Sequence, residues 1–299
     1  MITRSFSIAD FIVVVRLPDG CDVEALLPSF RPFQCERPWK EDEVLVEFTT
    51  EAADKSSLQI PIEELTLLEE NINDIGLVRL YEAGSKYYIT VSSISGHFTH
   101  AMLATDDFSV VEASLVWDDP NAGYMLCSLL RIAYSQAVLR RAAVSIHASA
   151  VSCDGRAYLF MGKSGTGKST HAALWLKHIS GCELLNDDNP TIRLVGDTVI
   201  AYGTPWSGKT SCYKQLSFPV GGMVRLSQAQ ENLFHFQAGP DAFIALYPGC
   251  SVINQNTGLR NQLFDSLVRM AELVQVGTLG CLPNKEAAIL CHQKLTEGF

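Results

Sequence analysis

The chain has 299 residues, of which 47% are hydrophobic and 19% are charged, and its formal net charge is −10. This composition excludes a disordered chain, a coiled coil and a small disulfide-rich protein, because it supplies enough apolar side chains for a large core. The acidic balance also argues against nonspecific nucleic-acid binding, which needs a clustered basic surface. At roughly 100–200 residues per domain, the length suggests two domains.

Several features predict a soluble, cytoplasmic protein that does not insert in a membrane. Apolar stretches such as 11–15 and 123–130 are far shorter than the roughly 18 residues that span a bilayer. The N-terminus does not resemble a signal peptide, because Asp10 precedes the apolar run and no small-residue cleavage site follows it. The nine cysteines include no C-x-x-C pair, so we expect free or buried thiols rather than disulfides or zinc ligands.

The charge is unevenly distributed along the chain. Residues 1–120 hold 22 acidic and 8 basic side chains, a net charge of −14, whereas residues 121–299 hold 11 and 15, a net charge of +4. A mildly basic C-terminal part suits an anionic small ligand, although ordinary surface composition explains the difference equally well.

Residues 1–120 are expected to form a β-rich accessory domain. Strands are predicted at 11–17, 97–103 and 110–117, and a hairpin joins 76–81 to 87–92 across a Gly-containing turn. We find no catalytic pattern in this part. His97 and His100 could share a strand face only if the strand were irregular, so a metal pair is not expected.

Residues 121–299 are expected to form a second domain of mixed α and β structure. Apolar spacing predicts helices at 121–141, 168–178 and 259–273, and a last helix with Asn284 as its N-cap. The predicted strands are 143–151, 157–161, 183–185, 190–195, 198–202 and 274–279.

The strongest motif is the octapeptide 162–169, Gly-Lys-Ser-Gly-Thr-Gly-Lys-Ser, which fits the phosphate-binding loop (P-loop, Walker A) pattern in full. Its glycines allow positive φ, so that successive N–H groups can surround a phosphate, and the helix that follows adds its N-terminal dipole. Lys168 is expected to reach the β- and γ-phosphates, and the Ser169 hydroxyl to hold Mg²⁺. The expected nucleotide-binding residues are Gly162, Lys163, Ser164, Gly165, Thr166, Gly167, Lys168, Ser169, Thr170 and, from a later loop, Lys209.

Two further positions are candidates for the chemistry. Asp187 and Asp188 follow a short predicted strand, where one carboxylate could accept a proton from an attacking hydroxyl while the other reaches the metal. A solvated turn is the alternative, because Asn-Asp-Asp-Asn-Pro is also favourable turn sequence. His147 lies on the strand before the P-loop strand, a position at which a histidine is more often part of the core.

These residues together resemble the catalytic domain of bacterial HPr kinase/phosphorylase, whose nucleotide fold is shared with phosphoenolpyruvate carboxykinases. The resemblance covers about residues 140–205 and implies a P-loop kinase domain of that type. It implies Asp187 as the proton acceptor, His147 near the transferred phosphate with Lys168, and Ser169 with Asp188 on Mg²⁺. HPr kinases are hexamers, but the N-terminal part of this chain looks unrelated to theirs, so the hexamer is not carried over and a homo-oligomer is only left open.

The chain also departs from that family. Ala148 stands where the family has a glycine, and the family's second signature, an acidic residue followed by Arg-Gly, has no counterpart here. Lys209 in the segment 203–210 could supply the missing positive charge or could simply be a solvated loop residue, and Lys214 and Arg225 are weaker candidates for the same role. A relative that phosphorylates a different hydroxyl therefore fits better than HPr kinase itself.

We therefore expect an ATP- and Mg²⁺-dependent kinase that transfers the γ-phosphoryl group to a hydroxyl of a protein, a peptide or a small molecule. The alternative is a nucleotide-binding regulator with little turnover, for which the acidic β-rich part would serve as a partner surface. Phosphoenolpyruvate carboxykinase activity is disfavoured, because the chain is much shorter than those enzymes.

Overall fold

The computed structural model describes residues 1–52, 58, 60–73, 75–94 and 96–297. It divides into two compact units, of which the first comprises residues 1–138 and 253–259 and the second comprises 139–252 and 260–299. Most of the segment 121–141, in which a helix was expected, belongs to unit 1. In the described part of the chain, no helix is both long and apolar enough to cross a bilayer.

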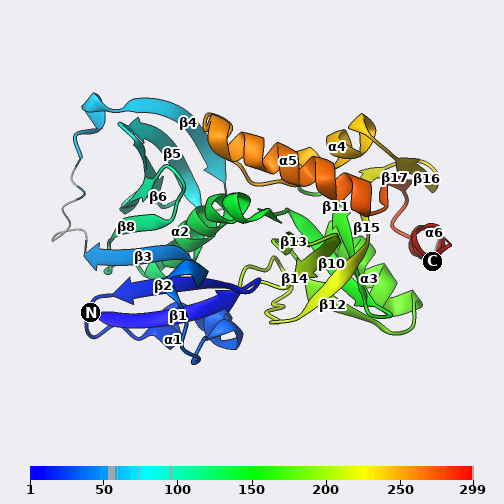
Figure 1. Cartoon of the computed structure of the whole chain (residues 1–299), viewed down its shortest axis with the longest axis horizontal. Helices are drawn as coiled ribbons and strands as arrows, with labels where there is room; N and C mark the ends of the chain where they lie inside the picture. Colours follow the sequence, from blue (N-terminus) through cyan, green and yellow to red (C-terminus); the bar gives the residue numbers. More distant parts are fainter. Residues whose placement is uncertain (53–57, 59, 74, 95, 298–299) are drawn as a thin grey trace. The chain divides into compact units, whose positions relative to one another are not determined.

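Unit 1 contains one mixed sheet, whose strand order over the described residues is β1-β2-β3-β8-β7-β6-β5-β4. The pairs β2–β3 and β3–β8 are parallel, and the other neighbours are antiparallel (Figure 1). The strands are β1 (Ile2–Ile8), β2 (Phe11–Leu17), β3 (Val44–Ala52), β4 (Thr66–Asn73), β5 (Gly76–Ala83), β6 (Lys86–Ser92), β7 (Thr99–Thr105) and β8 (Val110–Leu115). Its helices are the short α1 (Val23–Leu26) and α2 (Ala122–Ala137). The predicted strand 11–17 and the predicted hairpin are confirmed as β2 and β5–β6.

Helix α2 packs against β3, β7 and β8 through one apolar side. Met125, Leu126, Leu129, Leu130 and Ala133 recur at helical spacing and are buried. Next to this core, His100 and Asp119 form a fully buried pair. His100 Nε2 lies 2.9 Å from Asp119 Oδ2, and His100 Nδ1 accepts a hydrogen bond from Val116 N. Since Nδ1 is an acceptor, the ring proton is on Nε2 and the imidazole donates to the carboxylate.

Unit 2 is built around a second mixed sheet, with a main strand order of β12-β10-β11-β15-β14-β13-β9 over the described residues. Strand β17 also pairs with β15, and β16 pairs with β17. The strands are β9 (Ala143–Ser145), β10 (Ala148–Cys153), β11 (Arg156–Met161), β12 (Cys182–Asn186), β13 (Thr191–Val195), β14 (Thr198–Tyr202), β15 (Ser217–Gln228), β16 (Leu233–Gln237) and β17 (Val276–Cys281). The helices are α3 (Lys168–His178), α4 (Pro240–Leu246), α5 (Thr257–Leu273, in unit 2 from Arg260) and α6 (Lys285–Thr296).

Helices α3 and α6 pack against each other, and α3 also lies against β10, β11 and β12 (Figure 1). Trp175 of α3 is fully buried, and its ring contacts Tyr158 and Phe160 of β11. Tyr158 and Phe160 are two residues apart on the strand, so both face the same side of the sheet. This apolar layer fixes α3, and with it the loop from which α3 begins.

Most of the elements predicted for unit 2 are confirmed, and α3 has the predicted bounds. The predicted strand 143–151 is instead broken at residues 146–147. There β9 pairs with β13, whereas β10 pairs with β11 and β12, so the chain changes partners between them. His147 therefore lies in the break rather than within a strand, and its N–H donates to Gly249 O.

The long strand β15 was not predicted. It contains Pro219, Gly221 and Gly222, residue types that usually argue against a strand interior. The glycines are required by packing, because a Cβ atom at Gly221 would lie 2.7 Å from the Tyr158 ring and one at Gly222 would lie 2.7 Å from Leu295.

Candidate functional site

The glycine-rich loop joins β11 to α3, as the motif requires. Gly162, Gly165 and Gly167 all have positive φ, at 155°, 79° and 106°, which favours glycine at each position. The first hydrogen bond within α3 runs from His171 N to Gly167 O, so the amides of residues 168–170 have no acceptor within the helix. These amides, at the positive end of the helix dipole, form the kind of site that binds a phosphate.

Lys168 lies at the mouth of this loop and is almost completely buried. Its Nζ atom donates to Gly162 O at 3.1 Å and lies 2.9 Å from His147 Nε2. Burial lowers the pKa of Lys168, while the carboxylates of Asp188 and Asp187 act in the opposite direction. The lysine is therefore held in place by neutral acceptors, close to two negative charges.

His147 connects Lys168 to one of the two predicted carboxylates. Its Nδ1 atom lies 3.0 Å from Asp188 Oδ1. A protonated lysine can only donate, so Nε2 of His147 accepts and Nδ1 carries the ring proton that is donated to Asp188. The other carboxylate oxygen, Oδ2, accepts a hydrogen bond from Asn189 Nδ2. The structure thus brings three predicted residues, Lys168, His147 and Asp188, into one continuous series of contacts.

Asp187 faces a different set of neighbours. Its Oδ1 atom accepts a hydrogen bond of 2.8 Å from Ser149 Oγ, which itself lies 3.5 Å from Ser169 Oγ. Its Oδ2 atom accepts from Thr210 N at 3.3 Å. Asp187 and the predicted metal ligand Ser169 therefore both lie next to the Ser149 hydroxyl.

Two polar residues of this site were missed at the sequence level. Ser149 is two residues after His147 in Ser-Ile-His-Ala-Ser, and this spacing of two was a signal that could have indicated it. Asn186 is fully buried and shapes the turn that carries both aspartates. Its Oδ1 accepts from the N–H groups of Asp188 and Asn189, and its Nδ2 donates to Trp206 O.

The remaining predicted basic residues lie in different environments. Lys163 and Lys209 are exposed, and Lys209 precedes Thr210, whose N–H binds Asp187. Lys214 forms a 3.0 Å ion pair with Glu183. Arg225 donates to Ala245 O.

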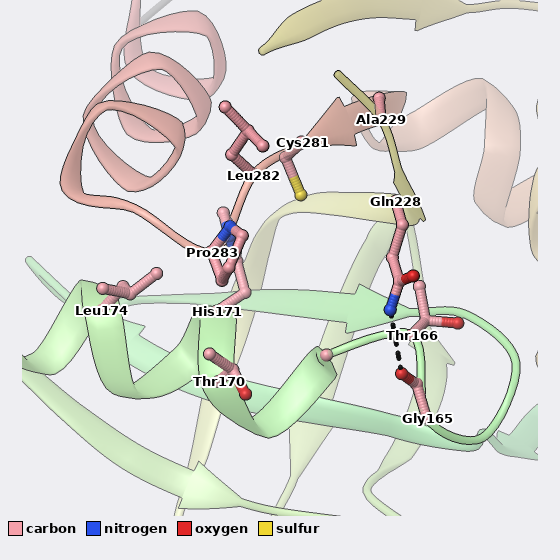
Figure 2. Close-up of a pocket in the computed structure, with 11 residues that line it drawn as sticks. Gly165, Thr166, Thr170, His171, Leu174, Gln228, Ala229, Cys281, Leu282 and Pro283 are labelled. Carbon is pink, nitrogen blue, oxygen red and sulfur yellow. Dashed lines mark hydrogen bonds between the residues drawn. The ribbon is translucent and has the colours of Figure 1, made fainter. Parts of the chain in front are cut away.

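A cavity of about 450 Å³ adjoins the loop on the side of α3 and β17 (Figure 2). Gln228, at the end of β15, reaches across it and donates from Nε2 to Gly165 O at 3.4 Å (Figure 2). The remaining wall is mostly apolar, and its members include Leu174, Ala229, Cys281, Leu282 and Pro283. Thr170, predicted to bind nucleotide, also lines this cavity. A cavity with apolar walls beside a phosphate-binding loop can accept the base and sugar of a nucleotide.

His171 also lines this cavity, and it is almost completely buried against the core beneath α3. Its Nε2 accepts a 3.1 Å hydrogen bond from Trp175 Nε1, and its ring packs edge-on against Phe160. Burial lowers the pKa of His171 to about 4, so the imidazole is neutral near neutral pH.

The residues present fit a magnesium ion of the kind that accompanies nucleotides. Mg²⁺ prefers oxygen ligands and keeps several waters, so it needs one or two protein oxygens beside the phosphates. The Asp187 carboxylate and the Ser169 hydroxyl both lie next to Ser149 and offer such oxygens.

The comparison with solved structures finds a likeness to the HPr(Ser) kinase/phosphatase from Coxiella burnetii. The sequence identity is 12%, the alignment covers 52% of this chain and 94% of that chain, and the TM-score is 0.30. At this TM-score the likeness carries no argument about fold or function. No protein-family model matches the chain, and the search of curated proteins finds no match.

Proposed function

We propose that unit 2 binds a nucleoside triphosphate with Mg²⁺ and transfers the γ-phosphoryl group to a hydroxyl acceptor. The observation that carries this proposal is the position of Lys168, which closes a complete glycine-rich loop and contacts His147, itself in contact with Asp188. A glycine-rich turn without a ligand would not need a buried cation facing two carboxylates. The relation to the HPr kinase catalytic domain is part of this proposal and rests on the motif residues.

The contacts support a division of work between the two aspartates. Asp187 lies with Ser169 around Ser149, which favours these two as the residues that would hold Mg²⁺. When bound, Mg²⁺ neutralises charge that develops on the phosphate oxygens. Asp188 is linked through His147 to Lys168, which favours this pair as the acceptor of the proton from the attacking hydroxyl. This distribution is the reverse of the one that the family resemblance implies.

The proposed reaction follows from these positions. The acceptor oxygen forms a bond to the γ-phosphorus as the bond between that phosphorus and the β–γ bridging oxygen breaks, and the nucleoside diphosphate leaves. The hydroxyl proton passes to the Asp188–His147 pair, and Lys168 with the loop amides stabilises the charge on the phosphates. The walls of the adjacent cavity would hold the nucleoside, and we propose ATP as the nucleotide.

Calorimetric titration of ATP and Mg²⁺ into the full-length protein tests the binding step. Lys168→Ala should weaken binding by at least about tenfold, because a hydrogen bond to a charged group contributes about 1.5–3 kcal/mol. Lys177→Ala, on the last turn of the same helix, is the matched control and should bind as the wild type does. Equal affinity in Lys168→Ala and wild type would refute the proposal.

Incubation with γ-labelled ATP and a cell extract then tests transfer and reveals the acceptor class. A labelled protein, peptide or small molecule that disappears with Lys168→Ala would support the kinase. A cytoplasmic extract is the appropriate source of acceptors, because the protein's cysteines are free thiols and we propose a reducing compartment.

A nucleotide-binding regulator with little turnover is the second candidate. It is favoured by the positions of the other basic side chains, since Lys214 and Arg225 are engaged with Glu183 and Ala245, and Lys209 is exposed. Efficient phosphoryl transfer usually needs a further cation on the transferred group. Tight binding of ATP without any labelled product would select this function over the kinase.

A further inference from the structure

Three potential metal ligands converge at the end of β10 that is remote from the P-loop, and Cys182 lies beside one of them. Cys153 is the last residue of β10, Asp154 follows it in the turn to β11, and His292 is on α6. One ligand atom from each of these residues lies within 4.8 Å of the other two. Cys182, the first residue of β12, is the cross-strand partner of Cys153, and its thiol lies next to that of Cys153.

We propose that Cys153, Asp154 and His292, with Cys182 as the fourth ligand, form a binding site for Zn²⁺. Three atoms that lie within 4.8 Å of one another always have a point no more than about 2.8 Å from all three. Zinc binds sulfur at about 2.3 Å and nitrogen or oxygen at about 2.0–2.2 Å. Side-chain shifts of less than about 1 Å would therefore bring three ligands to bonding distance.

The chemistry of the four donors selects the cation. Two thiols and an imidazole are ligands for zinc and similar transition metals, whereas Mg²⁺ and Ca²⁺ prefer oxygen alone. Zinc commonly takes four ligands drawn from cysteine, histidine and aspartate. The four donors belong to four different side chains, which lie on two strands, a turn and a helix. One bound cation would therefore cross-link these segments.

The residues around the proposed zinc site limit the movement of its ligand side chains but leave it open to solvent on one side. The ring of His292 packs edge-on against Trp175 at a centroid distance of 5.2 Å, which limits its rotation. Cys153 is buried, and its Sγ lies 3.7 Å from Ser180 O in the segment after α3. Asp154 is exposed, so a cation could enter from solvent on that side. The segments that would be joined are β10, β12 and α6.

This site is separate from the proposed kinase chemistry. The six-residue strand β10 begins next to His147 and ends at Cys153, so the two sites are about 17 Å apart along it. The role that follows is structural, because zinc would hold α6 against the sheet. Short-range cysteine spacing could not indicate this site, since its ligands lie at positions 153, 154, 182 and 292.

Cobalt titration of the chelator-treated full-length protein tests the proposal. Co²⁺ bound by thiolates in tetrahedral geometry gives charge-transfer absorption and visible bands, which Zn²⁺ should abolish by displacement. We expect one Co²⁺ per chain and a higher melting temperature after Zn²⁺ is added. His292→Ala and Asp154→Asn should weaken cobalt binding by at least about tenfold, because each removes a ligand.

His235→Ala is the matched control, because His235 is an exposed histidine on β16, outside the cluster. It should retain the wild-type cobalt spectrum. The proposal is overturned if wild-type protein gives no thiolate–cobalt bands, or if His292→Ala and Asp154→Asn both bind as wild type does. A Cys153–Cys182 disulfide, found by mass spectrometry in protein purified without reductant, would also overturn it.

Discussion

The Nζ atom of Lys168 lies 2.9 Å from Nε2 of His147, a residue 21 positions earlier in the chain. This contact places the loop lysine against a side chain whose other ring nitrogen faces Asp188 at 3.0 Å. A phosphate that enters the loop must therefore share Lys168 with His147 or displace it. The position of one lysine thus links anion binding to the state of the Asp188–His147 pair.

Replacing Asp188 and Asp187 one at a time by asparagine should impair different steps, phosphoryl transfer in one variant and Mg²⁺ binding in the other. Asp188→Asn should leave the affinity for ATP with Mg²⁺ within about threefold of wild type but reduce transfer by about 10²-fold or more, because it removes the proton acceptor. Asp187→Asn should instead abolish the gain in affinity that Mg²⁺ gives, because it removes a metal ligand. Titrations with and without Mg²⁺, combined with transfer assays, measure both effects. If Asp187→Asn instead abolished transfer and Asp188→Asn abolished the effect of Mg²⁺, Asp187 would be the proton acceptor and Asp188 the metal ligand, as the family resemblance implies.

Ser149 should act as a positioning residue for Asp187 and Ser169. Ser149→Ala removes a hydrogen bond to a carboxylate, which contributes about 1.5–3 kcal/mol, so the Mg²⁺ concentration for half-maximal binding of ATP should rise by about tenfold or more. ATP binding without Mg²⁺ should not change. Ser152→Ala on the same strand is the control, since its hydroxyl faces Glu183 O instead. An unchanged Mg²⁺ requirement in Ser149→Ala would exclude this role.

Unit 2 should lose stability in mild acid because of His171. Burial lowers the pKa of His171 from 6.5 to about 4, so between these values the unfolded chain binds a proton that the folded chain does not. The free energy of unfolding should therefore fall as the pH decreases from about 6.5 to about 4, by on the order of 3 kcal/mol. In His171→Gln, which can still accept from Trp175, this pH dependence should disappear. Urea unfolding at several pH values measures it, and an identical slope in the variant would contradict the prediction.

The buried pair of His100 and Asp119 should stabilise unit 1. Burial alone would raise the pKa of Asp119, but hydrogen bonds from Asn121 and His100 lower it below its ordinary value. A lowered carboxyl pKa contributes stability above the unfolded pKa and loses it as the pH falls through the folded one. Asp119→Asn should therefore cost about 1–3 kcal/mol near neutral pH and less in acid. Asp118→Asn, one residue earlier, is the control, and an equal loss at all pH values would argue against this assignment.

Local sequence signals predicted much of unit 2 and of the candidate site. The conformation of the loop and the start of α3 are determined by the residues of the octapeptide 162–169 itself, so they could be predicted from the local sequence. Asn284 was predicted as an N-cap, and its side chain accepts from Ala287 N. These features depend on residues within a few positions of one another.

Features that depend on distant segments could not be predicted. The break before His147 arises because β9 and β10 pair with different strands. The glycines of β15 are explained only by Tyr158 and Leu295, which lie far away in the chain. The position of Ser149 between Asp187 and Ser169 likewise needs three segments to meet.

The pairing of β15 has a consequence for how the protein is made. The second half of this strand lies between β11, which precedes it by some 60 residues, and β17, which follows it by about 50, and both pairings are parallel. Parallel pairing between such distant segments forms slowly, because the chain between them must be ordered first. During synthesis on the ribosome, a nascent chain can contain both the glycine-rich loop and β15 before β17 has been made. At that stage the edge of β15 that will pair with β17 is unpaired. That edge is closed only after residue 281 has been synthesised, so we expect unit 2 to depend on chaperones until then.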